Sequence, residues 1–158
     1  MPIIEMSVAL AHVKADDEDV EDPLFAMYLD SAQSICEGYC NRHFYEDDAE
    51  RFGAFDAGLE ALTTALNQRD ASLAIHDAFD IRAAIADRYI EQRGAALKMV
   101  NGCIADGTIK AAILLTFGHL YRNRQDNVVG QLSAVQLPVG AQRILQPYLW
   151  IGDLAGGS

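Results

Sequence analysis

The sequence predicts an all-α protein: a small helical bundle with a long central C-terminal helix, an inserted helical middle region and a flexible late loop and tail. Apolar residues recur at steps of three and four over several long segments, which is the spacing of a buried helix face. The alternation typical of strands is confined to 128–129 and 132–137. Hydrophobic residues make up 51% of the 158 residues, enough for one domain with a single core.

Two helices are expected near the N-terminus. Ser7 is a candidate N-cap for a short helix that ends near Lys14. Asp22 at the N-cap position and Pro23 at the first helical position predict a second helix, which runs to about Asn41. The buried face of this helix is expected to combine one stripe of Leu24, Tyr28, Ile35 and Tyr39 with a neighbouring stripe of Phe25, Leu29, Ala32 and Cys36.

The middle of the chain is predicted to be helical in pieces. The periodicity weakens over 44–53, which indicates a connection. Helical segments then follow at 55–66, 71–92 and 95–104, with Gly94, Gly102 and Gly107 as breaks or caps.

The stretch from Ile109 to Arg124 predicts the central helix of the bundle. Its apolar positions are Ile109, Ile113, Phe117, Leu120 and Tyr121, completed by Ala112, Leu115, Thr116 and His119 to a nearly all-round apolar surface. We therefore expect His119 to be a core histidine with a hydrogen-bond partner. After Leu137-Pro138, a short helix over 139–148 is expected to pack through Val139, Arg143, Ile144, Leu145 and Tyr148.

The charge is unevenly distributed along the chain. Residues 1–60 hold fifteen acidic and three basic residues, a net of −12, whereas residues 61–158 hold eight and nine, a net of +1. An acidic chain is repelled by phosphate backbones, which argues against sequence-reading DNA binding. The acidic residues also serve to keep the surface solvated.

The cysteines raise one alternative function. Three cysteines give no disulfide framework, and a reducing compartment suits them. Cys36, Cys40 and His43 share one side of a helix end, so the alternative is a small helical metal- or ligand-binding bundle that uses these three residues. A structural zinc site needs a fourth ligand, and free cysteines are most often small buried hydrophobes, so no metal or cofactor site is predicted. The sequence contains no catalytic motif, and no enzymatic activity is expected.

The order of parts in the last third carries a resemblance. A helix ending in His119-Leu120-Tyr121-Arg122-Asn123-Arg124 is followed by a loop, Leu137-Pro138-Val139-Gly140, a short helix and Pro147-Tyr148. This order resembles the gp6-like head–tail connector (adaptor) proteins of tailed bacteriophages. The resemblance covers 107–152 and also 4–44, where a turn with Asp17-Glu18-Asp19 leads into a helix ending in Tyr39-Cys40-Asn41-Arg42. The range 45–106 is unmatched.

The resemblance implies one connector-like domain over 1–158, with 45–106 as a helical insertion. It implies a structural protein of a phage or prophage particle that forms a ring of about a dozen copies through a head-to-tail contact. Such a ring lies below the portal protein, extends the DNA channel and docks the next connector, stopper or tail protein. DNA passes through without sequence-specific binding, and no membrane is involved. The protein is expected in the neck of the virion, and in the host cytoplasm during assembly.

By the same analogy, the late loop and the C-terminal segment are expected to contact neighbouring subunits or the portal. A large aromatic residue beside a glycine-rich terminus is a common interface anchor, which favours Trp150. The predicted interface residues are Asn127, Val128, Val129, Leu132, Val135, Tyr148, Trp150 and Ile151.

Overall fold

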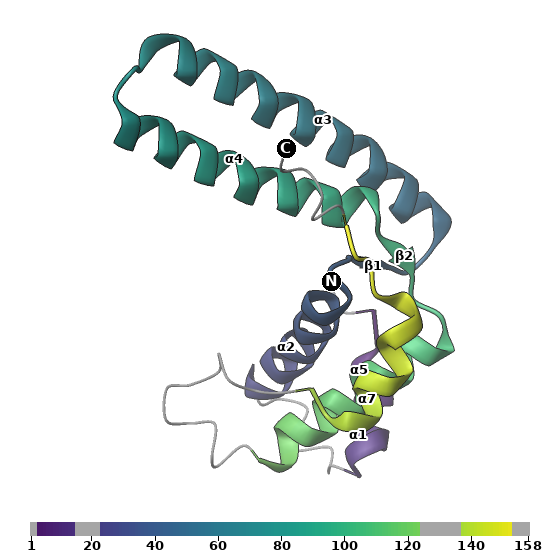
Figure 1. The fold of residues 1–158 in the computed structure, drawn as a ribbon. Helices are drawn as coiled ribbons and strands as arrows, with labels where there is room; N and C mark the ends of the chain where they lie inside the picture. Colours follow the sequence, from purple (N-terminus) through teal and green to yellow (C-terminus); the bar gives the residue numbers. More distant parts are fainter. Residues whose placement is uncertain (1–2, 15–22, 124–136, 153–158) are drawn as a thin grey trace. The chain divides into compact units, whose positions relative to one another are not determined.

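The computed structural model describes residues 3–14, 23–123 and 137–152. The chain divides into two compact units, one of Met1–Phe44 with Ala105–Ser158 and one of Tyr45–Ile104 (Figure 1). Both units are helical, so the predicted all-α class is confirmed. The second unit falls within the range 45–106 that was predicted to be a helical insertion. The flexible loop and tail predicted from the sequence lie outside the described residues.

The first unit is a small bundle built around one helix. Its described elements are α1 (Met6–Val13), α2 (Pro23–Cys40), α5 (Gly107–Arg122), α7 (Val139–Leu145) and a short 3-10 helix, η3 (Gln146–Tyr148). Helix α5 contacts α1, α2 and α7 (Figure 1), which confirms it as the central helix of the bundle.

The core of α5 follows the predicted apolar periodicity. Ile109, Ile113, Phe117 and Leu120 are all at most 1% exposed. The ring of Phe117 meets Phe25 of α2 edge-on, with 4.8 Å between the ring centroids. Such aromatic pairs add about 0.5–1.5 kcal/mol to the burial of their surface, so this contact is a main point of attachment between α2 and α5.

The apolar surface of α5 is narrower than predicted. Leu115 is 39% exposed, and His119 is exposed rather than part of the core. The side-chain amide of Asn123 lies 3.3 Å from His119 Nε2. The prediction of a core histidine was wrong because the neighbouring helices of the bundle leave this side of α5 facing solvent.

Helix α2 begins at Pro23, as predicted, and ends at Cys40. Its buried side chains are Phe25, Tyr28, Leu29, Ala32, Cys36 and Cys40. Leu24 is 47% exposed, so the first of the two predicted stripes is buried only in part. The stripe that begins at Phe25 faces α5, and the side chain one position earlier is rotated away from that contact.

The ends of the bundle differ from prediction in two places. Helix α1 has Glu5 rather than Ser7 at its N-cap position, without a side-chain cap. In α7, Ala141 and Leu145 are fully buried, whereas the predicted packing positions Val139 (65% exposed) and Arg143 are exposed. A helix of about two turns that lies on the surface of the bundle buries only one of its sides.

The second unit is a helical hairpin of α3 (Asp48–Ile75) and α4 (Phe79–Val100), which run side by side (Figure 1). Strands β1 (Phe44–Tyr45) and β2 (Cys103–Ile104) pair into a two-stranded sheet where the chain enters and leaves this unit. The middle of the chain therefore forms two long helices instead of the three segments predicted.

Local hydrogen bonds explain where α3 begins. The side chain of Asp47 accepts a hydrogen bond from the backbone N–H of Glu50 (2.8 Å), and the Glu50 carboxylate accepts one from the backbone N–H of Glu46 (2.8 Å). This reciprocal arrangement is close to a capping box, which stabilises a helix start. It places the helix start at Asp48, inside the range predicted as a connection.

The hairpin turns at 76–78, not at the glycines. Gly94 lies inside α4, with open space where a side chain would project. Arg82 donates hydrogen bonds to the carbonyl oxygens of Leu73 and His76, at 3.4 Å each. These bonds satisfy carbonyl groups that the end of a helix leaves without an intrahelical partner.

Candidate interaction site

The candidate site is the segment from Tyr148 to Gly152 in the first unit, which begins at the last residue of η3. The backbone N–H of Trp150 donates a hydrogen bond to the carbonyl oxygen of Cys40 (3.0 Å), at the end of α2. The hydroxyl of Tyr148 donates one to the carboxylate of Asp106, at the start of α5. The segment is therefore held against the ends of two core helices.

Asp106 links this segment to α5. Its carboxylate caps the helix by accepting hydrogen bonds from the backbone N–H groups of Thr108 and Ile109, at 2.9 Å each. The hydrogen bond from Tyr148 and those from the two backbone groups hold the pKa of Asp106 below its ordinary value. An Asp followed by Gly107, Thr108 and an apolar run is a sequence signature of a helix start, so the capping role of Asp106 could have been predicted from the sequence.

The segment presents apolar side chains to solvent. Ile151 is 83% exposed and Leu149 36%, while Trp150 is half-buried. Gly152 lies directly against the indole ring of Trp150, where even a methyl group would collide with it. The segment thus places three neighbouring apolar residues, two of them exposed, on an anchored backbone, which makes it the candidate interaction surface.

Of the eight predicted interface residues, the described part of the chain includes three. Tyr148, Trp150 and Ile151 lie together in the anchored segment. The other five predicted interface residues, Asn127, Val128, Val129, Leu132 and Val135, lie outside the described residues.

The three residues of the predicted alternative have separate partners. The thiol of Cys36 lies 3.5 Å from the hydroxyl of Thr116, and burial raises the pKa of Cys36 to about 11. The thiol of Cys40 donates to the carbonyl oxygen of Leu145 (3.9 Å). Within the described ranges, no group of three or more His, Cys, Asp or Glu side chains could hold a metal ion.

The third of those residues, His43, belongs to a hydrogen-bonded cluster around Glu37. The Glu37 carboxylate accepts hydrogen bonds from the side chain of Gln33 and the backbone N–H of Phe44, at 3.1 Å each, and lies 3.0 Å from His43 Nδ1. Burial by itself raises the pKa of Glu37, but these hydrogen bonds outweigh it and hold the pKa below its ordinary value. The cluster fixes the turn after α2, where Asn41 has a positive φ of 54°.

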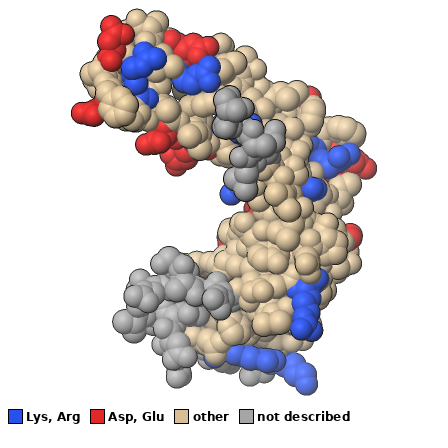
Figure 2. Space-filling view, in the orientation of Figure 1, with Lys and Arg blue, Asp and Glu red and all other residues tan. Residues whose placement is uncertain are grey.

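The charge of the two units differs among the described residues. The described first unit carries five Lys or Arg against four Asp or Glu, and Figure 2 shows mainly blue cationic side chains on its visible face. The hairpin carries both signs (Figure 2). The acidic excess of the first unit thus comes from residues outside the described ranges, above all the acidic residues of 16–22.

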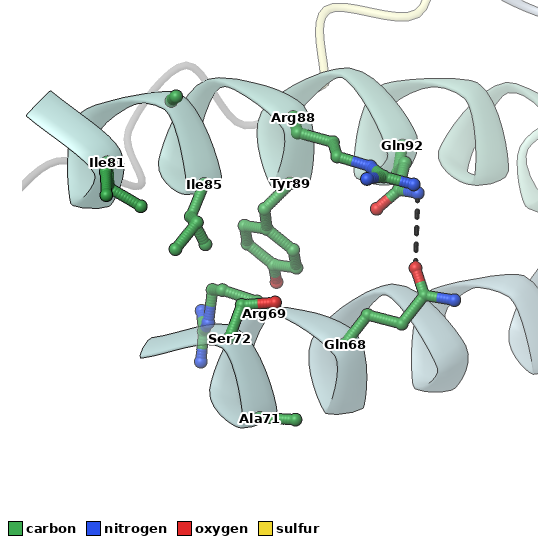
Figure 3. A pocket seen from close by; sticks show the side chains of 10 residues that line it. Gln68, Arg69, Ala71, Ser72, Ile81, Ile85, Arg88, Tyr89 and Gln92 are labelled. Carbon is green, nitrogen blue, oxygen red and sulfur yellow. Dashed lines mark hydrogen bonds between the residues drawn. The ribbon is translucent and has the colours of Figure 1, made fainter. Parts of the chain in front are cut away.

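The hairpin contains a hollow of about 460 Å³ between α3 and α4, near the turn that joins them (Figure 3). On α4 it is lined by Ile81, Ile85 and Tyr89. The guanidinium carbon of Arg69 lies over the Tyr89 ring, 4.6 Å from the ring centroid. Gln92 and Gln68 are joined across it by a hydrogen bond of 3.4 Å. The hollow combines apolar walls with a few polar groups, but it is open and two of those polar groups bind each other.

No protein-family model, curated protein or solved structure matches this chain. In the part of the chain that the structure describes, none of the helices has both the length and the apolar character needed to cross a bilayer.

Proposed function

We propose that this protein is a structural head–tail connector of a tailed bacteriophage or prophage. In this role, copies of the chain form a ring below the portal, extend the DNA channel and dock the next connector, stopper or tail component. The protein acts without a cofactor, and DNA passes through the ring without sequence-specific contacts.

One observation supports the proposal above all others. The two segments that resemble the connector family, 4–44 and 107–152, are separated by more than sixty residues, yet both belong to the same compact unit. Within that unit, α2 of the first segment packs against α5 and α7 of the second. The unmatched middle of the chain forms a unit of its own. Two motifs that resemble parts of one domain are thus also neighbours in space.

In this proposal, the anchored segment from Tyr148 to Gly152 contacts a neighbouring subunit or the portal. Ile151 is 83% exposed on a backbone that is held at Cys40 and Asp106. A side chain on an anchored backbone loses little conformational freedom when a partner covers it, which favours binding.

The test is assembly of the full chain with its cognate portal, followed by negative-stain electron microscopy and light scattering. We expect ring-shaped particles on the portal for the wild type and a much weaker association for Ile151→Ser. Ile75→Ser is the matched control, because Ile75 is 76% exposed and lies in the hairpin. The proposal is wrong if the wild type does not bind the portal, or if Ile151→Ser and Ile75→Ser weaken binding equally.

A further inference from the structure

The α3–α4 hairpin is held together by small residues. Among its described helical residues, the buried ones are Gly58, Ala65 and Ala96. Several large apolar side chains of the hairpin therefore lie at exposed positions instead of between its two helices.

On α3 these large side chains form a regular row. Phe52, Phe55, Leu59, Leu62 and Leu66 follow one another at steps of three, four, three and four. Four of them are exposed large hydrophobics: Phe52 is 60% exposed, Phe55 40%, Leu59 43% and Leu66 39%. An apolar repeat of this kind is the seam by which one helix packs along another.

A second row lies on α4. Phe79, Ala83, Ala86 and Ile90 follow at steps of four, three and four, and Leu97 continues the row one heptad after Ile90. Phe79 is 84% exposed and Ile90 65%. Leu97 is closer to the base of the hairpin and is half-buried.

Both rows lie on the same face of the hairpin. Leu59 and Leu66 each follow directly after a buried residue of α3, Gly58 and Ala65, and Leu97 follows the buried Ala96 of α4. One residue further along a helix corresponds to a rotation of about 100° about its axis. Each row is therefore rotated by about this angle, and in the same sense, from the side of its helix that contacts the other helix. Two antiparallel neighbours are related by a local two-fold axis, so an equal rotation places both rows on one side.

The hollow described above lies on the opposite side. Three of the residues that line it each come one position before a residue that points between the helices: Gln68, Ala84 and Arg88. About the helix axis they are therefore rotated away from the helix contact in the opposite sense to the two apolar rows. The hairpin thus has one face of large apolar residues and another of mainly small and polar residues, on which Ile81 also lies.

The apolar face is large enough for a stable contact. Its six most exposed apolar residues are Phe52, Phe55, Leu59, Leu66, Phe79 and Ile90. At about 200 Å² for a side chain of this size, their exposed fractions correspond to about 660 Å² of apolar surface. A stable interface takes about 800 Å² from each partner, so these residues supply most of one side.

We propose that the apolar face of the α3–α4 hairpin binds the same face of a second copy of this chain, forming an intermolecular four-helix bundle. Two apolar rows that lie side by side need two partner helices at the same spacing. A second copy of the hairpin provides two such helices, each with its own apolar row. A self-complementary face gives a closed two-fold dimer. Arg93 lies beside this face, and its methylenes can be covered while its guanidinium remains at the margin. The pairing does not rest on the connector assignment, because the hairpin has no counterpart in that family.

The experiment is sedimentation or light scattering of the full chain over a wide concentration range. We expect a concentration-dependent species of twice the chain mass for the wild type. The double variant Leu59→Gln/Ile90→Gln should dimerise more than about a hundredfold more weakly, because two-fold symmetry removes four apolar contacts from each dimer. Both side chains are exposed in the single chain, so the variant should fold, which circular dichroism checks.

Ile81→Gln is the matched control. Ile81 is 43% exposed, like Leu59, and lies on the same helix as Ile90 but lines the hollow on the other face. The Ile81→Gln variant should therefore dimerise as strongly as the wild type. The pairing is refuted if the wild type stays monomeric at every concentration, or if the double variant associates as strongly as the wild type. Equal weakening by Ile81→Gln also refutes it, since the contact would then not be specific to this face. If the wild type forms an assembly larger than a dimer, the pairing predicts that the double variant lowers the mass of that assembly. An unchanged mass would then refute it.

Discussion

Gly58 offers a test of the packing between the hairpin helices, because two opposing effects can be compared there. Replacing a glycine by alanine inside a helix normally stabilises it by about 1 kcal/mol, since alanine loses less backbone freedom on folding. At Gly58, however, an added Cβ would lie 2.7 Å from Val100 Cγ2 and 3.2 Å from both the carbonyl oxygen of Ala96 and the Cβ of Met99. None of these groups can move aside easily, because one belongs to a stiff β-branched side chain and another to helix backbone.

The expected outcome is therefore a loss of stability. Forcing an additional carbon atom into a well-packed contact costs about 1–3 kcal/mol, which exceeds the gain in helix propensity. We expect Gly58→Ala to destabilise the hairpin by about 1 kcal/mol. The control is Gly53→Ala in the same helix, where nothing lies within 4 Å of the added Cβ. That variant should stabilise the hairpin by about 0.5–1 kcal/mol.

Native-state hydrogen exchange is the suitable assay, because it reports the opening free energy of α3 and α4 separately from that of the first unit. Opposite signs for the two glycine variants would support the close approach at Gly58. The reasoning is refuted if Gly58→Ala protects the hairpin amides as well as Gly53→Ala does, because the helices would then have room that the structure does not provide.

Three further predictions concern Phe117, Glu37 and the three cysteines. Phe117→Ala should lower the free energy of unfolding by about 3–5 kcal/mol in urea titrations, because it removes a fully buried ring at the centre of the bundle; a loss below about 1 kcal/mol would contradict this packing. Because the pKa of Glu37 is lowered on folding from its ordinary value of 4.5, its stabilising effect should be present above that pH and decline as the pH falls further. Glu37→Gln should flatten that decline, and an unchanged pH profile would contradict the role of the cluster. In the folded protein, Cys103, which is only half-buried, should react with a thiol reagent well before the buried Cys36 and Cys40; equal rates would contradict this order.

Local sequence signals predicted most of the helices. Pro23 marks the first residue of α2, and the recurrence of Ile109, Ile113 and Phe117 identifies the central helix, because both signals depend on residues within a few positions of each other. The division of the middle of the chain was predicted less well. Glycines were given more weight than the capping pair Asp47 and Glu50, although glycine is tolerated inside a long helix at modest cost.

The candidate site could be predicted only in part. Trp150 and Ile151 stand out in the sequence as apolar residues next to a glycine-rich end. Their anchoring could not be read from it, because the hydrogen bond from Trp150 to Cys40 joins residues 110 positions apart. The capping role of Asp106 has a local sequence signal, whereas its bond to Tyr148 depends on where η3 lies relative to α5.

The sequence by itself determined that this protein is helical and which residues share a side of each helix, because both properties follow from spacing along the chain. The tertiary structure decided which of those sides is covered. Leu24 and Phe25 are equally apolar neighbours, yet only Phe25 faces α5. His119 is exposed because none of the helices in the described residues covers its side of α5. The large apolar row of α3 is exposed because Gly58 and Ala65 form the contact with α4. Periodicity marks a possible buried face, but burial itself requires a partner, whose position is set by long-range contacts.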